Sequence, residues 1–195
     1  MMVGDGGTRH ASRVRQNRLS NDSPAPSGGT RVIGLGNLMR GDDGVGVRVT
    51  QMLMSRDLPD AVQVVDGGTR GLGLVSLMEG WKRVILVDAA DVGQAPGRFV
   101  RFTPQEAQLL GQDLHLSAHE AGLRDALLLA NALNLLPEEI VIYGVQPASL
   151  EWEDRLSPQV EASIPVLVGS ILDELQADAA DHSASSAHPS TLAKE

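Results

Sequence analysis

Between residues 31 and 176, short apolar segments typical of β-strands alternate with longer segments in which apolar residues recur at helical spacing. Strands are expected at 31–35, 61–65, 83–87, 97–102 and 139–145. Helices are expected at 44–55, at 71–79, after Thr103-Pro104, at 117–135 and at 158–175. Such alternation predicts a parallel sheet between two layers of helices. Polar and apolar residues alternate along Gly97–Phe102, so we expect this strand at an edge of the sheet, running antiparallel.

The two ends of the chain differ from this central region. Residues 1–30 and 177–195 contain few large apolar side chains. Such segments bury too little surface to offset the entropy lost on ordering. We therefore expect one folded domain over residues 31–176, between a disordered N-terminal leader and a disordered C-terminal tail.

The composition argues against several classes of protein. A net charge of -9 is unlike that of a nucleic-acid-binding surface. Apolar residues make up 42% of the chain, which is enough for a core, but no apolar run is long enough to span a membrane. The absence of cysteine excludes disulfides, thiolate metal ligands and a thiol nucleophile. Because the leader has no apolar stretch typical of an export signal, we expect a cytoplasmic protein, by default a monomer, that binds neither nucleic acid nor membrane.

The first expected strand leads into a glycine-rich loop, Gly34-Leu-Gly-Asn-Leu-Met-Arg-Gly-Asp-Asp-Gly44. A dinucleotide-binding loop would need a glycine where Met39 stands. The carboxylates of Asp42 and Asp43 would also repel a phosphate. The loop is therefore typical of a site for a cation, or for a group that carries one.

Other polar residues are expected at the same edge of the sheet. Asp66 and Asp88 follow the second and third strands, and ligands of open α/β sheets bind beyond the carboxyl ends of the strands. His119 falls in the first turn of the helix expected to begin at Ser117. A helix N-terminus disfavours the charged imidazolium, so His119 should be neutral and able to bind a metal. Two carboxylates and one imidazole suit a borderline divalent ion such as Ni²⁺ or Zn²⁺.

Each of these residues also has a purely structural interpretation. Asp43 would serve as a helix cap and Asp88 as a turn residue. Asp66 precedes Gly-Gly-Thr, which is good turn chemistry, and for this residue the structural interpretation is the stronger one. His119 taken alone is more often an ordinary surface residue.

His115 and His119 have the spacing of a helical pair of zinc ligands, as in zinc proteases. That motif requires a glutamate directly after the first histidine, and Leu116 stands there instead. Ser117 is also expected to cap the helix, which would leave His115 outside it. The sequence further lacks the serine-hydrolase elbow and the phosphate-binding loop of NTPases.

The order of the motifs resembles that of the hydrogenase maturation proteases, which trim the large subunit of nickel-iron hydrogenases. Five motifs carry the resemblance: Gly34–Gly46; Asp66-Gly-Gly-Thr69; Val87-Asp-Ala89 with Ala95-Pro-Gly97; Ser117-Ala-His119 with Gly122-Leu123; and Gly144-Val-Gln-Pro147. The resemblance covers residues 31–176. It implies a three-layer α/β/α sandwich with a five-stranded, mostly parallel twisted sheet.

The resemblance also implies the reaction and its residues. The large-subunit precursor would be cut near its C-terminus after nickel insertion, and Asp43, Asp88 and His119 would be the nickel contacts and the catalytic residues. Many relatives have glutamate at the position of Asp43, so its reach to the metal is shorter here. Nickel would arrive bound to the cysteines of the substrate precursor rather than as a permanent cofactor. A leader as long as residues 1–30 is atypical of the family.

Two other functions remain open from the sequence. One is a nickel chaperone or checkpoint protein that docks the precursor through the same three residues without cutting it. The other is a small-molecule hydrolase or nucleotide-binding protein on the same kind of fold. Selectivity for one client hydrogenase would lie in surface loops, for example over residues 105–116.

Overall fold

The computed structural model describes residues 28–109, 115–116 and 120–185. Within these ranges the strands are β1 (Thr30–Leu35), β2 (Val62–Gly68), β3 (Arg83–Asp91), β4 (Phe99–Phe102), β5 (His115–Leu116) and β6 (Glu139–Val145). The α-helices are α2 (Val45–Leu53), α3 (Leu74–Met78), α4 (Pro104–Leu109), α5 (Glu120–Ala132) and α6 (Pro158–Ser185). Two short 3-10 helices, η1 (Gly41–Gly44) and η2 (Gly71–Gly73), precede α2 and α3.

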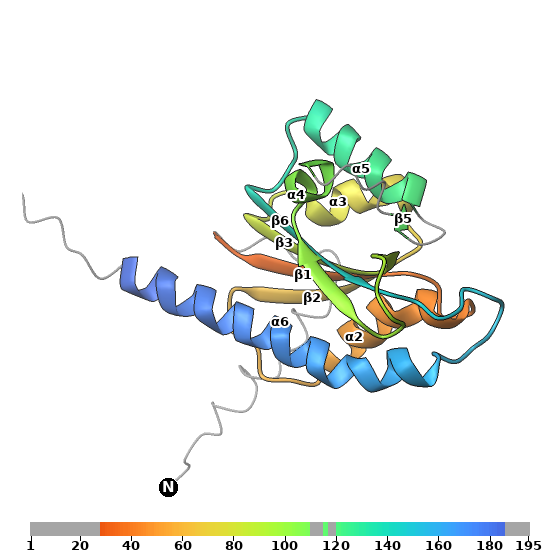
Figure 1. The fold of residues 1–195 in the computed structure, drawn as a ribbon. Coiled ribbons are helices and arrows are strands. Elements are labelled where there is room, and N and C mark those ends of the chain that lie inside the picture. Colours follow the sequence, from red (N-terminus) through yellow and green to blue (C-terminus); the bar gives the residue numbers. More distant parts are fainter. Residues whose placement is uncertain (1–27, 110–114, 117–119, 186–195) are drawn as a thin grey trace, which may run out of the picture.

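The main sheet of the described chain has the strand order β2-β1-β3-β6-β4. β1 pairs in parallel with both β2 and β3, and β3 pairs in parallel with β6. β4 runs antiparallel to β6 at the edge, as the alternating sequence of Gly97–Phe102 predicted. The two-residue strand β5 adds an antiparallel pairing at the end of β3. The predicted α/β/α sandwich with a five-stranded, mostly parallel sheet is confirmed (Figure 1).

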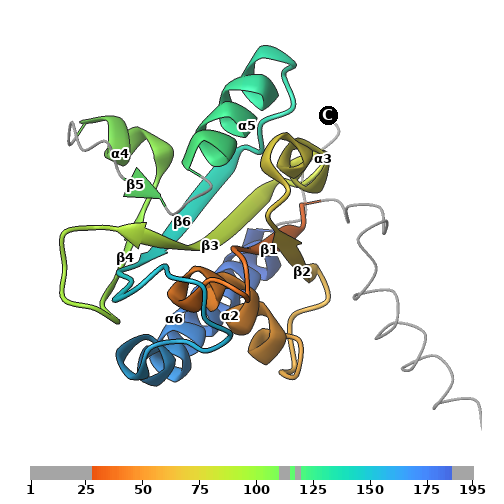
Figure 2. The same cartoon turned by 90° about the vertical axis from the view of Figure 1, so that its right-hand side faces the viewer.

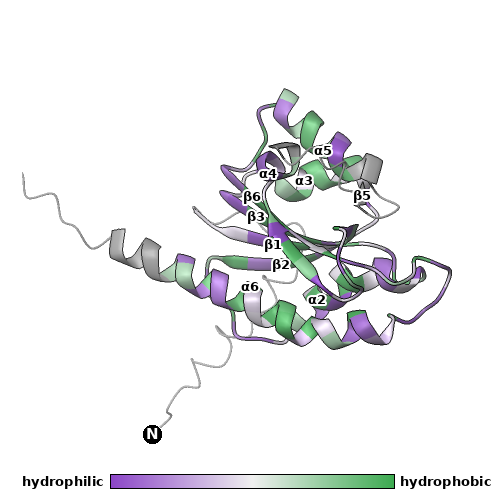
Figure 3. Ribbon diagram, viewed as in Figure 1, coloured by the Kyte–Doolittle hydropathy of each residue, from purple (hydrophilic) through white to green (hydrophobic). Residues whose placement is uncertain are grey.

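Helices cover both faces of the sheet, α2 and α6 on one and α3 and α5 on the other (Figure 2). The side chains of β3 alternate between the two cores: Ile85 and Val87 face α2 and α6, whereas Leu86 and Ala90 face α3 and α5. Hydrophobic and hydrophilic stretches alternate along the outer helices, as on elements with one buried face (Figure 3). Among the described residues, no helix is both long enough and apolar enough to span a membrane.

Two strands extend further than the sequence suggested. β2 continues through Asp66 to Gly68, and β3 continues through Asp88 to Asp91, so neither aspartate ends its strand. The reason is pairing with neighbouring strands, because Asp66 is in register with Gly34 of β1 and Asp88 with Gly144 of β6. Pairing of this kind overrides the low strand propensity of aspartate and glycine.

The described ends of the chain also differ from expectation. Most of the leader expected over residues 1–30 lies outside the described residues, and β1 already begins at Thr30. The helix α6 continues through Ser185, past residue 176 where the folded domain was expected to end. An ion pair between Asp178 and Arg83 of β3 joins this part of α6 to the sheet. The expected start of the tail at residue 177 is therefore too early.

A network of charged side chains fastens α6 to the amino-terminal ends of β3 and β6. Glu174 of α6 accepts hydrogen bonds from Arg83, Arg101 and the Tyr143 hydroxyl. Arg83 also pairs with Glu139 at 3.1 Å. Burial, and after it the hydrogen bond to Glu174, raises the pKa of Tyr143 above its ordinary value. The network lies at the edge of the sheet opposite the candidate site.

Candidate active site

The strand order reverses direction between β1 and β3, since the chain first moves from β1 outward to β2 and then returns to β3. Ligands of open α/β sheets bind at such a switch point, beyond the carboxyl ends of the strands. Asp43 follows β1, and Asp88 lies in the carboxyl-terminal half of β3. Both side chains are fully buried. The fold thus brings two of the predicted site residues to one edge of the sheet.

Glycines allow the segment that carries Asp43 to pack closely on the sheet. Gly36 has φ +121°, and a Cβ atom there would lie 1.7 Å from the carbonyl oxygen of Asp43. A Cβ atom on Gly46 would lie 2.2 Å from the carbonyl oxygen of Val87, the residue before Asp88. Only residues without a side chain fit at these two positions. The start of α2 is therefore seated directly on the ends of β1 and β3.

The two adjacent aspartates of the loop have different surroundings. Asp43 accepts a hydrogen bond on Oδ2 from the backbone N–H of Asn37 at 2.8 Å, which orients its carboxylate inside the β1–α2 turn. Asp42 accepts backbone N–H groups of Ala148 at 2.7 Å and Ser149 at 3.2 Å. It also accepts the N–H of Ser157 at 2.7 Å and its hydroxyl at 2.9 Å.

Asp42 is therefore an anchor for the segment between β6 and α6. From the sequence, Asp42 was expected only as one of two adjacent carboxylates in the loop after the first strand, and Ser157 had no expected role. Neither role could be assigned from local pattern, because Asp42 and Ser157 are 115 positions apart. The adjacent Asp-Asp pair was the one available signal, since two neighbouring buried carboxylates need separate partners.

Asp88 lies in the middle of the sheet, on a strand paired on both sides. By alternation with Leu86 and Ala90, its side chain belongs to the face covered by α3 and α5. Asp43 instead precedes α2, which covers the other face. The two carboxylates thus approach the carboxyl edge of the sheet from different layers.

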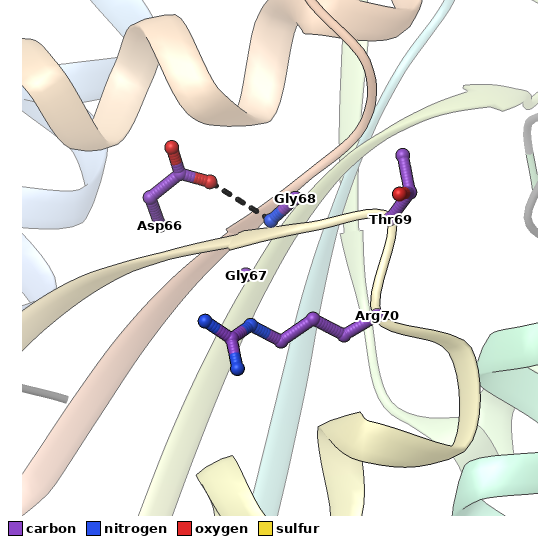
Figure 4. A pocket seen from close by; sticks show the side chains of 5 residues that line it. All are labelled: Asp66, Gly67, Gly68, Thr69 and Arg70. Atoms are coloured by element: carbon purple, nitrogen blue, oxygen red, sulfur yellow. Dashed lines mark hydrogen bonds between the residues drawn. The ribbon is translucent and has the colours of Figure 1, made fainter. Parts of the chain in front are cut away.

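Asp66 behaves as its structural interpretation predicted. It is exposed, and its Oδ1 accepts the backbone N–H of Gly68 at 2.8 Å (Figure 4). Asp66 also lines an open hollow of about 410 Å³, together with Gly67, Gly68, Thr69 and Arg70. This hollow lies beside the loop of Asp43, because the N–H of Gly36 donates to the carbonyl of Gly68 at 3.0 Å.

The third predicted ligand, His119, lies outside the described residues. His115 is described and belongs to β5, in register with Asp91, so it is not part of α5. This excludes the helical histidine pair of a zinc protease. Within the described part of the chain, no group of three or more histidine, cysteine, aspartate or glutamate side chains is placed to hold a metal ion. Asp43 and Asp88 are the described members of the predicted ligand set.

The sequence and the fold of this chain are similar to those of known proteins. A model of the hydrogenase maturation protease family matches residues 47–174. The chain belongs to the hydrogenase maturation protease family. It is 36% identical over 135 residues to the hydrogenase expression/formation protein HupD of Bradyrhizobium diazoefficiens, covering 68% of this chain and 70% of the relative. It is 34% identical over 147 residues to the hydrogenase 2 maturation protease of Escherichia coli K12, covering 74% and 89%.

A solved structure supports the family at the level of the fold. The hydrogenase maturating endopeptidase HybD from Escherichia coli superposes with a TM-score of 0.69 at 33% sequence identity. The similarity covers 77% of this chain and 93% of that chain. The resemblance stated from the five sequence motifs is therefore confirmed, and the chain is a member of an endopeptidase family.

Proposed function

We propose that this protein removes the C-terminal extension of a nickel-iron hydrogenase large-subunit precursor after nickel insertion, by recognising the nickel that the precursor carries. Membership in the maturation protease family supports the substrate. The observation that carries the proposal is the burial of Asp43 and Asp88, both without exposed surface, at the switch point of the sheet. Buried carboxylates at such a position are suited to a cationic group.

The nickel in this proposal belongs to the substrate. The chain has no cysteine, so any thiolates around the metal come from the precursor. Asp43, Asp88 and His119 would complete the coordination with two carboxylate oxygens and one imidazole nitrogen, a donor set suited to Ni²⁺. Docking would then depend on the metal, and a precursor without nickel would not be held in place.

The segments on either side of His119 support its assignment as the third ligand. Leu116 of β5 is in register with Ala90, two positions beyond Asp88 on the same face of β3. On the other side, α5 begins at Glu120 and packs its buried Leu123 against this face. The chain therefore lies on this side of the sheet both shortly before and shortly after residue 119.

The two buried carboxylates would have two tasks in peptide hydrolysis. By binding the docked group they would hold the scissile bond in one orientation, which removes much of the entropic cost of the reaction. A carboxylate of the pair would also accept the proton of the attacking water and then deliver it to the nitrogen of the leaving peptide as the C–N bond breaks. Peptide hydrolysis then needs no nucleophilic side chain, in keeping with the absence of cysteine and of a serine-hydrolase motif.

The proposal is tested by mass spectrometry of the large-subunit precursor from the same organism, incubated with the purified protein. Nickel-loaded and nickel-free precursors are compared. We expect a discrete C-terminal peptide to be released from the loaded form alone. Cleavage of both forms would contradict nickel recognition. Binding of the loaded form with no change in mass would contradict the protease and support a checkpoint protein instead.

A further inference from the structure

We propose that Arg70, with the glycine turn before it, forms a subsite for a carboxylate of the precursor's C-terminal extension. This inference rests on the proposed function and adds a specificity-determining residue to it. The hollow is lined by five consecutive residues at the carboxyl end of β2, Asp66 through Arg70. Neither the sequence motifs nor the family assignment gives Arg70 a role.

The hollow lies where a peptide held at the buried carboxylates would pass. Gly68, one of its lining residues, is hydrogen-bonded to Gly36, and Gly36 packs on the backbone of Asp43. The hollow therefore lies next to the glycine loop after β1, to which it is joined by the hydrogen bond between Gly36 and Gly68. A chain segment that enters at Asp43 and leaves along this edge of the sheet would cross the hollow.

The charges around the hollow favour an anion. Of the described residues that line it, Arg70 alone is positively charged. Its guanidinium reaches back beneath Gly67, whereas Asp66 lies on the other side of the strand with its Oδ1 directed at the N–H of Gly68 (Figure 4). The carboxylate of Asp66 thus stabilises the turn, and Arg70 is the charged side chain that faces the hollow.

Within the described chain, the hydrogen-bond donors of the Arg70 guanidinium are unused. No hydrogen bond or ion pair joins its guanidinium to another described residue. The backbone N–H groups of Thr69 and Arg70 likewise donate to no described carbonyl group. Gly68 has φ +50°, and a turn through this left-handed region followed by free N–H groups is a common anion-binding arrangement. A guanidinium beside such a turn can bind both oxygens of a carboxylate.

The chemistry of the substrate identifies the anion. In an unmodified polypeptide near neutral pH, the anions are the carboxylates of aspartate, glutamate and the chain terminus. A C-terminal extension always supplies the terminal carboxylate and, depending on its sequence, acidic side chains as well. Binding at Arg70 would therefore depend on the charge and length of the extension and not on the metal centre of the precursor.

The test compares cleavage of three nickel-loaded precursors by the wild type and by Arg70→Gln. The first precursor has its native extension. The second has the acidic side chains of the extension replaced by amides, and the third has a short Gly-Ser segment added, which displaces the terminal carboxylate. For the native precursor we expect kcat/KM to fall about tenfold, mostly through KM, the loss typical of one charge-assisted hydrogen bond.

The other two precursors identify the carboxylate. If an acidic side chain is bound, the effect of Arg70→Gln disappears with the second precursor; if the terminal carboxylate is bound, it disappears with the third. Arg70→Lys, which keeps the charge without the planar fork, should give an intermediate rate. Arg56→Gln, at an exposed arginine just beyond α2, should leave all rates unchanged.

Three results would overturn the subsite: wild-type rates for Arg70→Gln, an equal loss with all three precursors, or an equal loss in Arg56→Gln. Failure of the proposed function is seen separately, as absence of cleavage by the wild type. In that case calorimetry with a synthetic peptide of the extension decides the subsite. Binding weakened by Arg70→Gln supports it, and no binding to the wild type contradicts it.

Discussion

The carboxylate of Asp42 accepts both the backbone N–H of Ser157, at 2.7 Å, and its hydroxyl, at 2.9 Å, and so ties the loop after β1 to the start of α6. The neighbouring Asp43 belongs to the candidate site instead. Of these two adjacent aspartates, Asp42 holds the loop in place, and Asp43 is a member of the predicted ligand set. The first two predictions separate these roles.

Replacing Asp42 should lower the stability of the protein rather than act on its chemistry directly. In Asp42→Ala the backbone N–H groups of Ala148 and Ser157 lose their buried acceptor, which should lower the free energy of unfolding by about 3 kcal/mol. Urea denaturation followed by circular dichroism measures this loss. Asp154→Asn, an exposed change in the same segment, should stay within about 0.5 kcal/mol of wild type. Equal stability of the two variants would contradict the anchoring role.

Replacing Asp43 should have the opposite effect. In Asp43→Asn the side-chain oxygen can still accept the N–H of Asn37. The free energy of unfolding should therefore change by no more than about 1 kcal/mol. Cleavage of the nickel-loaded precursor should fall at least about 100-fold, because in the proposed function Asp43 supplies a charged ligand and is one of the two carboxylates that can act as the general base.

Asp88→Asn should reduce cleavage to a similar extent, and Asp91→Asn is its control. Asp91 is exposed at the end of the same strand, where its Oδ1 accepts the N–H of Gly93, a role that asparagine fills equally well. Asp91→Asn should therefore cleave at the wild-type rate. Wild-type cleavage by Asp43→Asn or Asp88→Asn would remove these residues from the site.

The close approach at Gly36 predicts that a single methyl group there is not tolerated. Gly36→Ala places a Cβ atom against the Asp43 carbonyl at an unfavourable φ, which should cost about 3 kcal/mol or more of stability. Gly169→Ala is the matched control, because a Cβ atom in that part of α6 meets no neighbour within 4 Å. Removal of a helical glycine should raise stability by about 0.5–1 kcal/mol. Thermal denaturation of the two variants should therefore shift in opposite directions.

The fold could be predicted because the spacing of apolar residues within each short segment indicates a strand or a helix. The strand expected at 139–145 is β6 with the same bounds, and the edge position of β4 followed from its alternating residues. The candidate site was harder, because it depends on contacts between distant segments. The partners of Asp42 lie more than 100 positions away, and nothing in the sequence near Asp42 indicates them.

Arg31 is a second residue whose surroundings the local sequence does not indicate, in this case in the core. A charged residue in a strand is ordinarily expected to face water, yet Arg31 is buried, with its guanidinium 4.5 Å from the ring centre of Trp81. It also donates to the carbonyl of Leu77 at 2.9 Å. Burial lowers the pKa of Arg31 to about 10, still high enough to leave it charged at neutral pH. The packing of α3 and Trp81 against the sheet, together with the acceptor side chain of Gln63 on β2, accounts for this position.

The network at the other edge of the sheet predicts how stability depends on pH. Burial alone would raise the pKa of the Glu174 carboxyl. The hydrogen bonds donated by Arg101 and Tyr143 outweigh burial, and the nearby charge of Arg83 adds to them. The pKa of Glu174 is therefore lowered in the folded protein. Its contribution to stability is complete above the ordinary pKa of glutamate and is lost as pH falls through the lowered value.

This dependence can be measured by urea denaturation of the wild type and Glu174→Gln between pH 7 and pH 3. At pH 7 the variant should be less stable by about 2 kcal/mol, because a glutamine cannot balance the charges of Arg83 and Arg101. The difference should shrink as the wild-type carboxylate becomes protonated. For Glu138→Gln, an exposed change just before β6, the free energy of unfolding should differ little from that of the wild type at every pH. A constant difference for Glu174→Gln would mean that its role is packing rather than charge.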